Sequence, residues 1–407
     1  MRTLIKNGHL LDTKTMEMSE ERTLVIEDGL IAAIGGKPTG QVDLTFDAKG
    51  SFVLPGFIDA HVHFRLASMD FRRLTKWSEV EYGIVMARLA RETLLRGFTT
   101  VRDVGGDVSG LQRAIKSGEA EGPRIIRAGR FISQTGGHGD VEGGDRAVPD
   151  CACQMRHTAF GIVADGVDAV RKAARHNLRE GSDFLKIHVS GGVATPSDPL
   201  DSVQYTQEEI KAVVVEAEHR HTYVAAHAYS PESIMLAVEN GVHTIEHGNL
   251  LDRSAAELMF EKGAILVPTL ATYEAMDQLG RQLGLPEANL KKNQEVYRVG
   301  LESLKIAKAA RVTMGWGTDL IGESQARQNR EFSIRSEVES AAEILTSMYQ
   351  VNPTLCHMQN QIGVIAPGAI ADLVVSKFNP LDDINVLANP HGTLEAIFQQ
   401  GRLVGSA

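Results

Sequence analysis

The sequence predicts an α/β protein in which a (β/α)8 TIM barrel is inserted into a small β-sandwich formed by both ends of the chain. Three observations lead to this prediction: short β-like runs at the start, similar runs at the end, and eight strand–helix units between them. The expected domains are 1–56 plus 363–407 for the composite sandwich and 57–362 for the barrel. A doubly wound sheet is the alternative that the alternation alone leaves open.

The first residues have the pattern of short strands joined by turns. Residues 1–8 are expected to form the first strand and turn. Gly and Asp separate the apolar runs that follow, which are Leu10-Leu11, 23–29 and 31–36. Near the other end of the chain, 371–375 and 396–404 repeat this pattern. The two ends are therefore expected to build one sandwich.

The middle of the chain alternates between strand and helix patterns. The candidate strands are 57–63, 99–103, 124–131, 184–189, 223–227, 243–247, 265–268 and 312–318. Amphipathic helical stretches lie between most of them, for example 82–96, 167–180, 207–221, 231–240 and 253–262. Ser230 and Pro231 form a helix start signal, and Gly97, Gly181, Gly241 and Gly263 stand where helices are expected to end.

The composition is that of a soluble globular protein, with 43% hydrophobic and 23% charged residues in a chain of 407. A net charge of -10 without a basic stripe argues against a nucleic-acid partner. No apolar run reaches the roughly 20 residues needed to cross a membrane. The start has no signal-peptide core, and three cysteines (Cys151, Cys153 and Cys356) make a poor disulfide framework, so a cytoplasmic location is expected.

The strongest local signal is the segment 55–63, which reads PGFIDAHVH. His61 and His63 are two residues apart on a candidate strand, so their side chains share a face. At the C-terminal end of a barrel strand they would lie in the active-site mouth. Two neutral imidazoles form half of a zinc site, whereas a pair of structural rim residues is the alternative.

Lys186 stands in the centre of the apolar strand 184–188. Burial of an ammonium is costly unless its charge is removed or paired. Carboxylation by carbon dioxide would turn the amine into a bidentate anionic ligand. The alternative is a lysine that reaches the rim or pairs with a carboxylate such as Asp103 or Asp319.

Three further candidate strands end in residues that bind metals. His227 and His247 close the fifth and sixth strands, and Asp319 closes the eighth. Together with the two histidines of the first strand and the lysine of the fourth, they predict a metal centre at one end of the barrel.

These residues resemble the motifs of the amidohydrolase superfamily, whose members join a composite β-sandwich to a barrel. The resemblance covers nearly the whole chain: 55–63, Lys186, His227, His247, the Gly-Thr-Asp of 317–319 and the PGAIADLV of 367–374. It falls in the imidazolonepropionase-like branch and is strongest to the Xaa-Pro dipeptidases, the prolidases.

The resemblance implies two zinc ions bridged by carboxylated Lys186 and a hydroxide. The remaining ligands divide into His61, His63 and Asp319 for one ion and His227 and His247 for the other. The hydroxide is a strong nucleophile near neutral pH, and Asp319 would accept its proton and deliver it to the leaving amine.

Two residues beyond the metal ligands are predicted to touch substrate. His138 lies in the glycine-rich loop 135–140, and relatives with Gly-Gly-His at this loop direct the histidine to the substrate carbonyl. The His-Ala-Tyr-Ser of 227–230 resembles the prolidases. The Tyr229 hydroxyl could bind the terminal carboxylate of a dipeptide, and a tyrosine packed under the rim is the alternative.

Carboxylate recognition favours an arginine. Four arginines in the expected mouth loops are candidates: Arg65, Arg146, Arg327 and Arg330. The long segment 132–165 is expected to be a functional lid. Its acidic residues Asp140, Glu142 and Asp145 either select a basic side chain or form a solvated loop face.

Two positions depart from the superfamily patterns. Trp316 is bulkier than the residue expected before the aspartate's turn, so it is expected to narrow the pocket. The helix expected after the barrel, 354–361, lacks the alanine-rich stretch common in relatives.

The predicted function is therefore a binuclear zinc dipeptidase, with a dipeptide as its small-molecule partner and a homo-oligomeric state implied by the resemblance. Release of C-terminal Arg or Lys and hydrolysis of a cyclic amide, such as an imidazolone or hydantoin, are the enzymatic alternatives. A catalytically silent scaffold is the non-enzymatic alternative, and the presence of all six candidate ligands argues against it.

Overall fold

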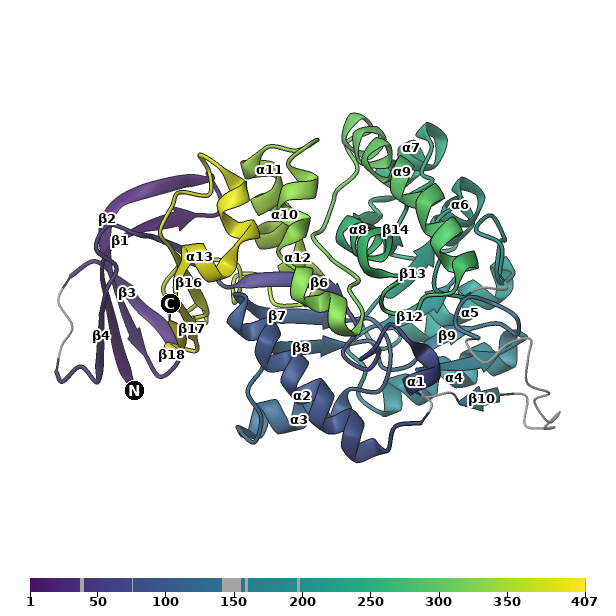
Figure 1. The fold of residues 1–407 in the computed structure, drawn as a ribbon, viewed down its shortest axis with the longest axis horizontal. Helices are drawn as coiled ribbons and strands as arrows, with labels where there is room; N and C mark the ends of the chain where they lie inside the picture. The colour runs from purple at the N-terminus through teal and green to yellow at the C-terminus, as the bar shows by residue number, and fades with distance from the viewer. Residues whose placement is uncertain (37–39, 75, 141–154, 158–159, 196–197, 407) are drawn as a thin grey trace.

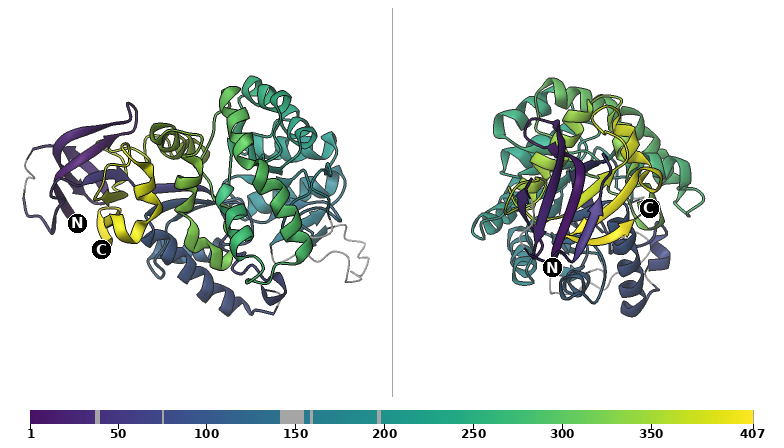
Figure 2. Two further views of the ribbon diagram at one scale, coloured as in Figure 1. Left: turned by 45° about the horizontal axis from the view of Figure 1, so that its top comes forward. Right: turned by 90° about the vertical axis from the view of Figure 1, so that its left-hand side faces the viewer.

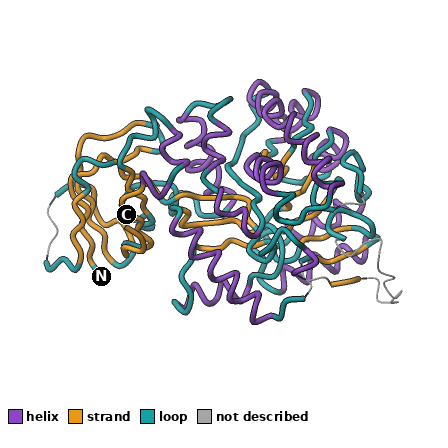
Figure 3. Tube along the Cα trace, in the orientation of Figure 1, coloured by secondary structure: helices purple, strands orange, loops and turns teal. Residues whose placement is uncertain are grey.

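The computed structural model describes all residues except 37–39, 75, 141–154, 158–159, 196–197 and 407. It is an α/β structure in which strands of both chain ends lie at one end of the molecule and helices surround the remaining strands (Figures 1 and 3). No helix in the described part of the chain combines the length and the apolar character that a membrane crossing requires.

Both ends of the chain, which the sequence predicts to build one sandwich, contribute strands to a single eight-stranded sheet (Figure 2). The C-terminal strands join the N-terminal strands where β16 pairs antiparallel with β5. The side chains of both ends pack in a common core that includes Leu24, Val53, Leu373 and Phe398. The strands are β1 (Arg2–Asp12), β2 (Glu17–Glu27), β3 (Leu30–Ile34), β4 (Leu44–Asp47), β5 (Phe52–Pro55), β16 (Leu373–Ser376), β17 (Leu394–Gln399) and β18 (Arg402–Ser406).

The turn predicted at the end of residues 1–8 is wrong. β1 continues through this point to Asp12 as one strand with an irregularity between Ile5 and Gly8, where Asn7 has a φ of 54°. A bulge bends a strand without ending it. The first half of β1 consequently pairs with β4 and the second half with β5.

The middle of the chain supplies two sheets of mainly parallel strands. The first has the order β6-β7-β8 and the second the order β10-β11-β9-β12-β13-β14-β15. All of their pairs are parallel except β10–β11. The strands are β6 (Phe57–Val62), β7 (Phe98–Asp103), β8 (Arg124–Arg127), β9 (Phe131–Ser133), β10 (Met155–His157), β11 (Gly161–Ala164), β12 (Leu185–His188), β13 (Val224–Ala228), β14 (Thr244–His247) and β15 (Ile265–Val267).

Two of the eight predicted strands differ from the structure. The third, 124–131, is divided into β8 and β9, because Gly129 between them has a φ of 75°. The eighth, 312–318, forms a single bridge from Met314 to Leu266. Its backbone still connects the two sheets: Gly315 N donates to Leu266 O at 2.8 Å, and Ala60 N donates to Trp316 O at 2.9 Å.

The five predicted helices are confirmed, with ends that differ by at most three residues. They are α2 (Glu79–Leu95), α4 (Val167–Arg179), α5 (Gln207–Glu218), α6 (Pro231–Glu239) and α7 (Arg253–Lys262). Ser230 caps α6 with Pro231 in the first turn, as predicted, and Gly263 ends α7 with a φ of 68°. The remaining α-helices of the described chain are α1 (Phe71–Leu74), α3 (Ser109–Ser117), α8 (Leu270–Leu279), α9 (Glu287–Ala309), α10 (Arg330–Arg335), α11 (Ala341–Thr346), α12 (Asn352–Leu355) and α13 (Pro390–Thr393). Short 3-10 or π helices are η1 (Gly322–Arg327), η2 (Ser347–Val351) and η3 (Ile384–Ala388).

The helix predicted at 354–361 is wrong. α12 ends at Leu355, and a turn follows in which His357 and Asn360 have positive φ values of 53° and 61°. A left-handed residue cannot continue a right-handed helix.

Candidate active site

All eight residues singled out in the sequence line one pocket: His61, His63, His138, Lys186, His227, Tyr229, His247 and Asp319. They come from β6, β12, β13, β14 and the loops that follow strands. Because the strands run parallel, their carboxyl ends meet on one side, and residues far apart in the chain become neighbours there.

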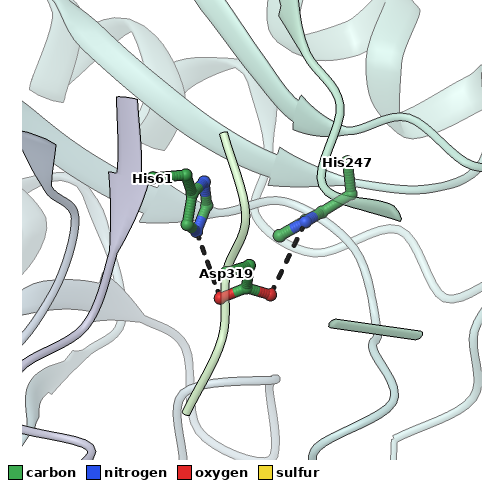
Figure 4. A group of neighbouring side chains, drawn as sticks. All are labelled: His61, His247 and Asp319. Atoms are coloured by element: carbon green, nitrogen blue, oxygen red, sulfur yellow. Dashed lines mark ion pairs between the residues drawn. The ribbon is translucent and has the colours of Figure 1, made fainter. Parts of the chain in front are cut away.

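Asp319 lies at the centre of the imidazole cluster. Its Oδ1 is 3.4 Å from Nε2 of His61 and 3.2 Å from Nε2 of His63, and its Oδ2 is 3.8 Å from Nδ1 of His247. Figure 4 shows His61 and His247 on opposite sides of the carboxylate. Ligand atoms of His61, His247 and Asp319 all lie within 4.8 Å of one another, a His-His-Asp group that could hold a metal ion.

Two residues of this group have left-handed backbones, His247 with a φ of 75° and Asp319 with a φ of 54°. Such conformations cost about 1–3 kcal/mol in a non-glycine residue and persist where neighbours enforce them. Asp319 N donates to His61 O at 2.8 Å, and Nδ1 of His247 lies 2.8 Å from Oγ1 of Thr269. These contacts hold both residues in strained backbone conformations, and in these conformations both side chains point into the pocket.

Each histidine of the predicted centre uses one ring nitrogen for a contact outside the cluster. Nδ1 of His61 is 2.6 Å from Glu246, Nδ1 of His63 is 3.3 Å from the Gly105 carbonyl, and Nε2 of His227 is 3.1 Å from the Gly191 carbonyl. The second nitrogen is left for another partner. Nε2 of His61 is buried and has no hydrogen-bond partner in the described residues. A metal ion would satisfy this atom, so the donor set fits a metal centre.

Lys186 is 2% exposed and lies in the centre of β12. Burial lowers its pKa to about 8, although the nearby charges of Glu246 and Asp319 act in the opposite direction. Asp103, one of the expected alternative partners, instead accepts from the backbone N–H groups of Phe64 and Gly105 at 2.9 and 3.2 Å. With a pKa of about 8, Lys186 loses its proton more readily than an exposed lysine does.

His138 lies over the cluster from the glycine-rich loop. Its ring stacks on His227 with centroids 4.2 Å apart and an interplanar angle of 14°. Its Nδ1 is 3.3 Å from Oδ2 of Asp198, and its backbone N donates to Gln204 at 3.0 Å. Gly192 makes this placement possible, because a Cβ at that position would overlap the His138 ring.

Tyr229 is buried beside the histidines of β13 and β14. Its ring centroid is 4.8 Å from that of His227, and its hydroxyl lies 2.8 Å from the hydroxyl of Tyr273. Burial raises the pKa of both phenols, so both are neutral hydrogen-bond donors and acceptors.

His188 lines the same pocket and was not predicted. Its ring centroid is 5.1 Å from that of His138 and 5.3 Å from that of His227, and its Nδ1 is buried without a hydrogen-bond partner in the described chain. Burial holds its pKa well below its usual value, so the ring is neutral. The signal was present in the sequence, because His188 is two residues after Lys186 and so shares its face of the strand.

Two of the four arginines considered for carboxylate binding form ion pairs outside the pocket. Arg65 forms a two-pronged pair with Glu79 at 2.7 and 2.9 Å, and Arg330 pairs with Glu274 at 2.7 Å. Neither these two nor Arg327 lines the pocket. The fourth candidate, Arg146, lies outside the described residues.

The expected lid is partly described. β11 and most of β9 belong to it, and Asp140 accepts from the Gly136 N–H at 3.1 Å, so this carboxylate is buried in its own loop and is not a solvated face. Glu142, Asp145, Cys151 and Cys153 lie outside the described residues.

The expectation that Trp316 narrows the pocket is wrong. Trp316 is fully buried between Phe98 and Phe332, at ring-centroid distances of 5.3 and 4.9 Å, and is absent from the pocket lining. The bulk of this side chain fills the protein core.

Comparison with known proteins places these features in a family. The model of the amidohydrolase family matches residues 52–404. The ochratoxinase of Aspergillus niger is 29% identical over 395 residues, covering 93% of this chain and 82% of the relative. A prolidase solved in complex with N-methylphosphonate-L-proline covers both chains fully at 42% identity and a TM-score of 0.94. A Xaa-Pro dipeptidase solved with bound methionine also covers both chains fully, at 31% identity and a TM-score of 0.90.

Proposed function

The chain belongs to the amidohydrolase family and is a hydrolase of carbon–nitrogen bonds, and from this premise we propose that it is a prolidase-like dipeptidase that cleaves Xaa-Pro dipeptides. One observation carries the proposal. His138 and Tyr229 flank His227, at ring-centroid distances of 4.2 and 4.8 Å, in the pocket that holds the His-His-Asp group. Two solved structures similar over their whole length, a prolidase and a Xaa-Pro dipeptidase, support it.

The proposed architecture is a complete (β/α)8 barrel, residues 57–362, inserted in a sandwich of 1–56 and 363–407. Its eighth strand is the segment 312–318. Support comes from the hydrogen bonds of this segment to Leu266 on one side and to Ala60 on the other, since a barrel requires its last strand to contact its first.

We propose that the cluster holds two zinc ions, with carboxylated Lys186 between them. A pKa near 8 supports the carboxylation, because the neutral amine is the form that adds to carbon dioxide. The nitrogen forms a bond to the carbon and loses a proton. The metal centre, when bound, supplies an activated water and a Lewis acid for the scissile carbonyl. Its ligands would be His61, His63 and Asp319 for one ion and His227 and His247 for the other.

The protein side chains would perform three tasks around the scissile bond. Asp319 accepts the proton of the attacking water and returns it to the leaving nitrogen. His138 donates a hydrogen bond to the carbonyl oxygen, whose charge grows in the transition state. Tyr229 donates its hydroxyl hydrogen to the terminal carboxylate of the dipeptide.

The pocket lining favours an apolar substrate over a basic one. Asp319 is the only carboxylate among the lining residues that are described, and it belongs to the imidazole cluster. A basic side chain would therefore be desolvated without a partner. Apolar side chains form much of the remaining wall: Leu66, Phe131, Val193, Met276 and Ile321. This argues for Xaa-Pro cleavage and against release of C-terminal Arg or Lys.

A dipeptide-library assay on the zinc-loaded protein tests the proposal, with free amino acids measured by mass. Release of proline from Xaa-Pro substrates, and none by the Asp319→Asn variant, is the expected result. Release of Arg or Lys instead would move the activity to a carboxypeptidase. Inactivity on the library with metal bound would refute the dipeptidase proposal and direct the search to cyclic amides.

A further inference from the structure

We propose that the buried pair Arg102–Glu246 is a positioning device for the metal centre, which orients His61 and fixes the ring nitrogen that carries its proton. This inference rests on the proposed metal centre. Neither residue binds the metal in this arrangement, and each acts through His61.

Glu246 makes three short contacts at the base of the pocket. Its Oε2 lies 2.6 Å from Nδ1 of His61, and its Oε1 accepts from Nη2 of Arg102 and from Oγ1 of Thr244, each at 2.6 Å. The side chains of Arg102, Glu246 and His61 are 0%, 0% and 1% exposed. Both carboxylate oxygens thus accept hydrogen bonds, and the group cannot rotate without losing a partner.

Arg102 in turn contacts two strands, β6 and β14, and the residues that directly precede β12 and β13. Its Nε donates to the carbonyl of Ala60 in β6 at 2.5 Å, and its Nη1 donates to the hydroxyl of Tyr223 at 3.2 Å. Its guanidinium also lies 5.1 Å from the centroid of the Phe184 ring. The arginine therefore ties the strand that carries His61 to the strand that carries Glu246 and His247.

The chemical consequence concerns the two nitrogens of His61. Because the carboxylate of Glu246 only accepts, Nδ1 of His61 must donate to it, and Nε2 keeps its lone pair. Nε2 is the buried atom without a hydrogen-bond partner in the described residues, 3.4 Å from Asp319. A carboxylate behind a ligating imidazole fixes both tautomer and ring orientation and strengthens metal binding.

Glu246→Gln tests the inference through metal affinity. An amide would present an N–H group either to His61 or to Arg102, which already donate at these points. We expect zinc affinity, measured by competition with a chelator and metal analysis, to fall by about 10- to 100-fold. Activity should return in excess zinc, because the catalytic groups remain.

A double variant separates positioning from stability. Glu246→Gln alone leaves the Arg102 charge unpaired, so Arg102→Met with Glu246→Gln removes both charges together. Arg335→Met with Glu339→Gln is the matched control, since this buried pair has equally low exposure, 0% and 2%, and contacts no predicted metal ligand. Melting of the metal-free proteins measures the cost of losing each pair.

The expected result is weakened zinc binding in the Arg102/Glu246 double variant and near wild-type binding in the control, whatever their melting temperatures. Wild-type zinc affinity in a folded Arg102/Glu246 double variant would overturn the inference and leave the pair a structural one. If the wild-type protein takes up no zinc, the metal centre of the proposed function fails, and the inference fails with it.

Discussion

Asp319 illustrates how much of this site depends on single residues in unusual surroundings. Its backbone is left-handed, and its carboxylate reaches three imidazoles within 3.2–3.8 Å. Although burial opposes ionisation, the neighbouring histidines hold its pKa well below the usual value. The group is an ionised acceptor, as its proposed role as a base requires.

Asp319→Asn should therefore abolish turnover while the protein remains folded. An amide cannot accept and return a proton, and general-base catalysis contributes about 10²–10⁴-fold. Steady-state kinetics of the variant measure the loss of turnover, and circular dichroism checks that the variant is folded. Activity within a few-fold of wild type would contradict the role of Asp319 as proton shuttle.

Lys186→Ala should lower the bound zinc, because the proposed bridge is lost. Short carboxylic acids, added to the variant, should restore part of the activity by occupying the space of the carboxylated side chain. Metal analysis and rates with and without acetate provide the measurement. An unchanged metal content would count against the bridge.

Gly192→Ala should displace His138, since the new methyl group would overlap its ring. A misplacement of about 1 Å in a catalytic group can cost as much as 10²-fold, so we expect kcat/KM to fall at least tenfold. Gly110→Ala, in α3, is the matched control, because a Cβ there meets no atom within 4 Å. Equal kinetics of the two variants would remove His138 from the mechanism.

At the scale of elements, parallel strands and the loops that follow them supply the proposed metal ligands, and α9 contacts one wall of the pocket. Nζ of Lys292 donates to the carbonyls of Gly192 and Thr195, at 3.1 and 2.8 Å, and lies 3.4 Å from Oδ1 of Asp198. The hydroxyl of Thr195 donates to the carbonyl of His138 at 2.5 Å. One helix thus orders the loop that lines the pocket.

Lys292→Met should loosen this loop and raise KM several-fold with a smaller effect on kcat, because the metal ligands are untouched. Lys291→Met, exposed on the same helix, is the control and should leave the kinetics unchanged. Substrate-saturation curves of the two variants measure KM and kcat. An unaltered KM for Lys292→Met would show that the loop holds its shape without the lysine.

The sequence predicted most elements of the central region because their signals are local. Apolar periodicity locates α5, and periodicity together with the Ser230 cap and Pro231 locates α6, without knowledge of the fold. The predicted third strand failed at Gly129, since the strand pattern continues through a residue whose positive φ divides it. The turn predicted near Asn7 is wrong because Asn7, a residue type that favours turns, lies in a bulge inside β1.

At the scale of the whole molecule, buried ionisable groups outside the site influence stability. Glu331 in α10 is fully buried, and its carboxyl Oε2 accepts from the Ala271 N–H in α8. Burial raises its pKa from 4.5 to about 8, in spite of the opposing charge of Arg335. The folded protein therefore keeps a proton that the unfolded chain releases at lower pH.

Stability should consequently fall as the pH rises from about 5 to 8, by up to about 1.4 kcal/mol per pH unit from this group. Glu331→Gln mimics the protonated acid and should lose this contribution, so its advantage over wild type should grow with pH. Denaturant unfolding of both proteins across this range measures the difference. Parallel pH profiles would show that Glu331 does not titrate in this interval.

The homo-oligomeric state implied by the family resemblance stays a prediction.

The sequence by itself determined most strands and helices of the central region and the candidate ligands, because their signals are short-range patterns. The similar strand patterns at the two chain ends also predicted that both ends build one sandwich. Only the tertiary structure decided which side chains meet. It pairs Arg102 with Glu246, adds His188 and Tyr273 to the pocket, and directs Arg65 and Arg330 away from it. The physical reason is that a side chain's partner depends on how distant strands are arranged around one another, and spacing along the chain carries no record of that arrangement.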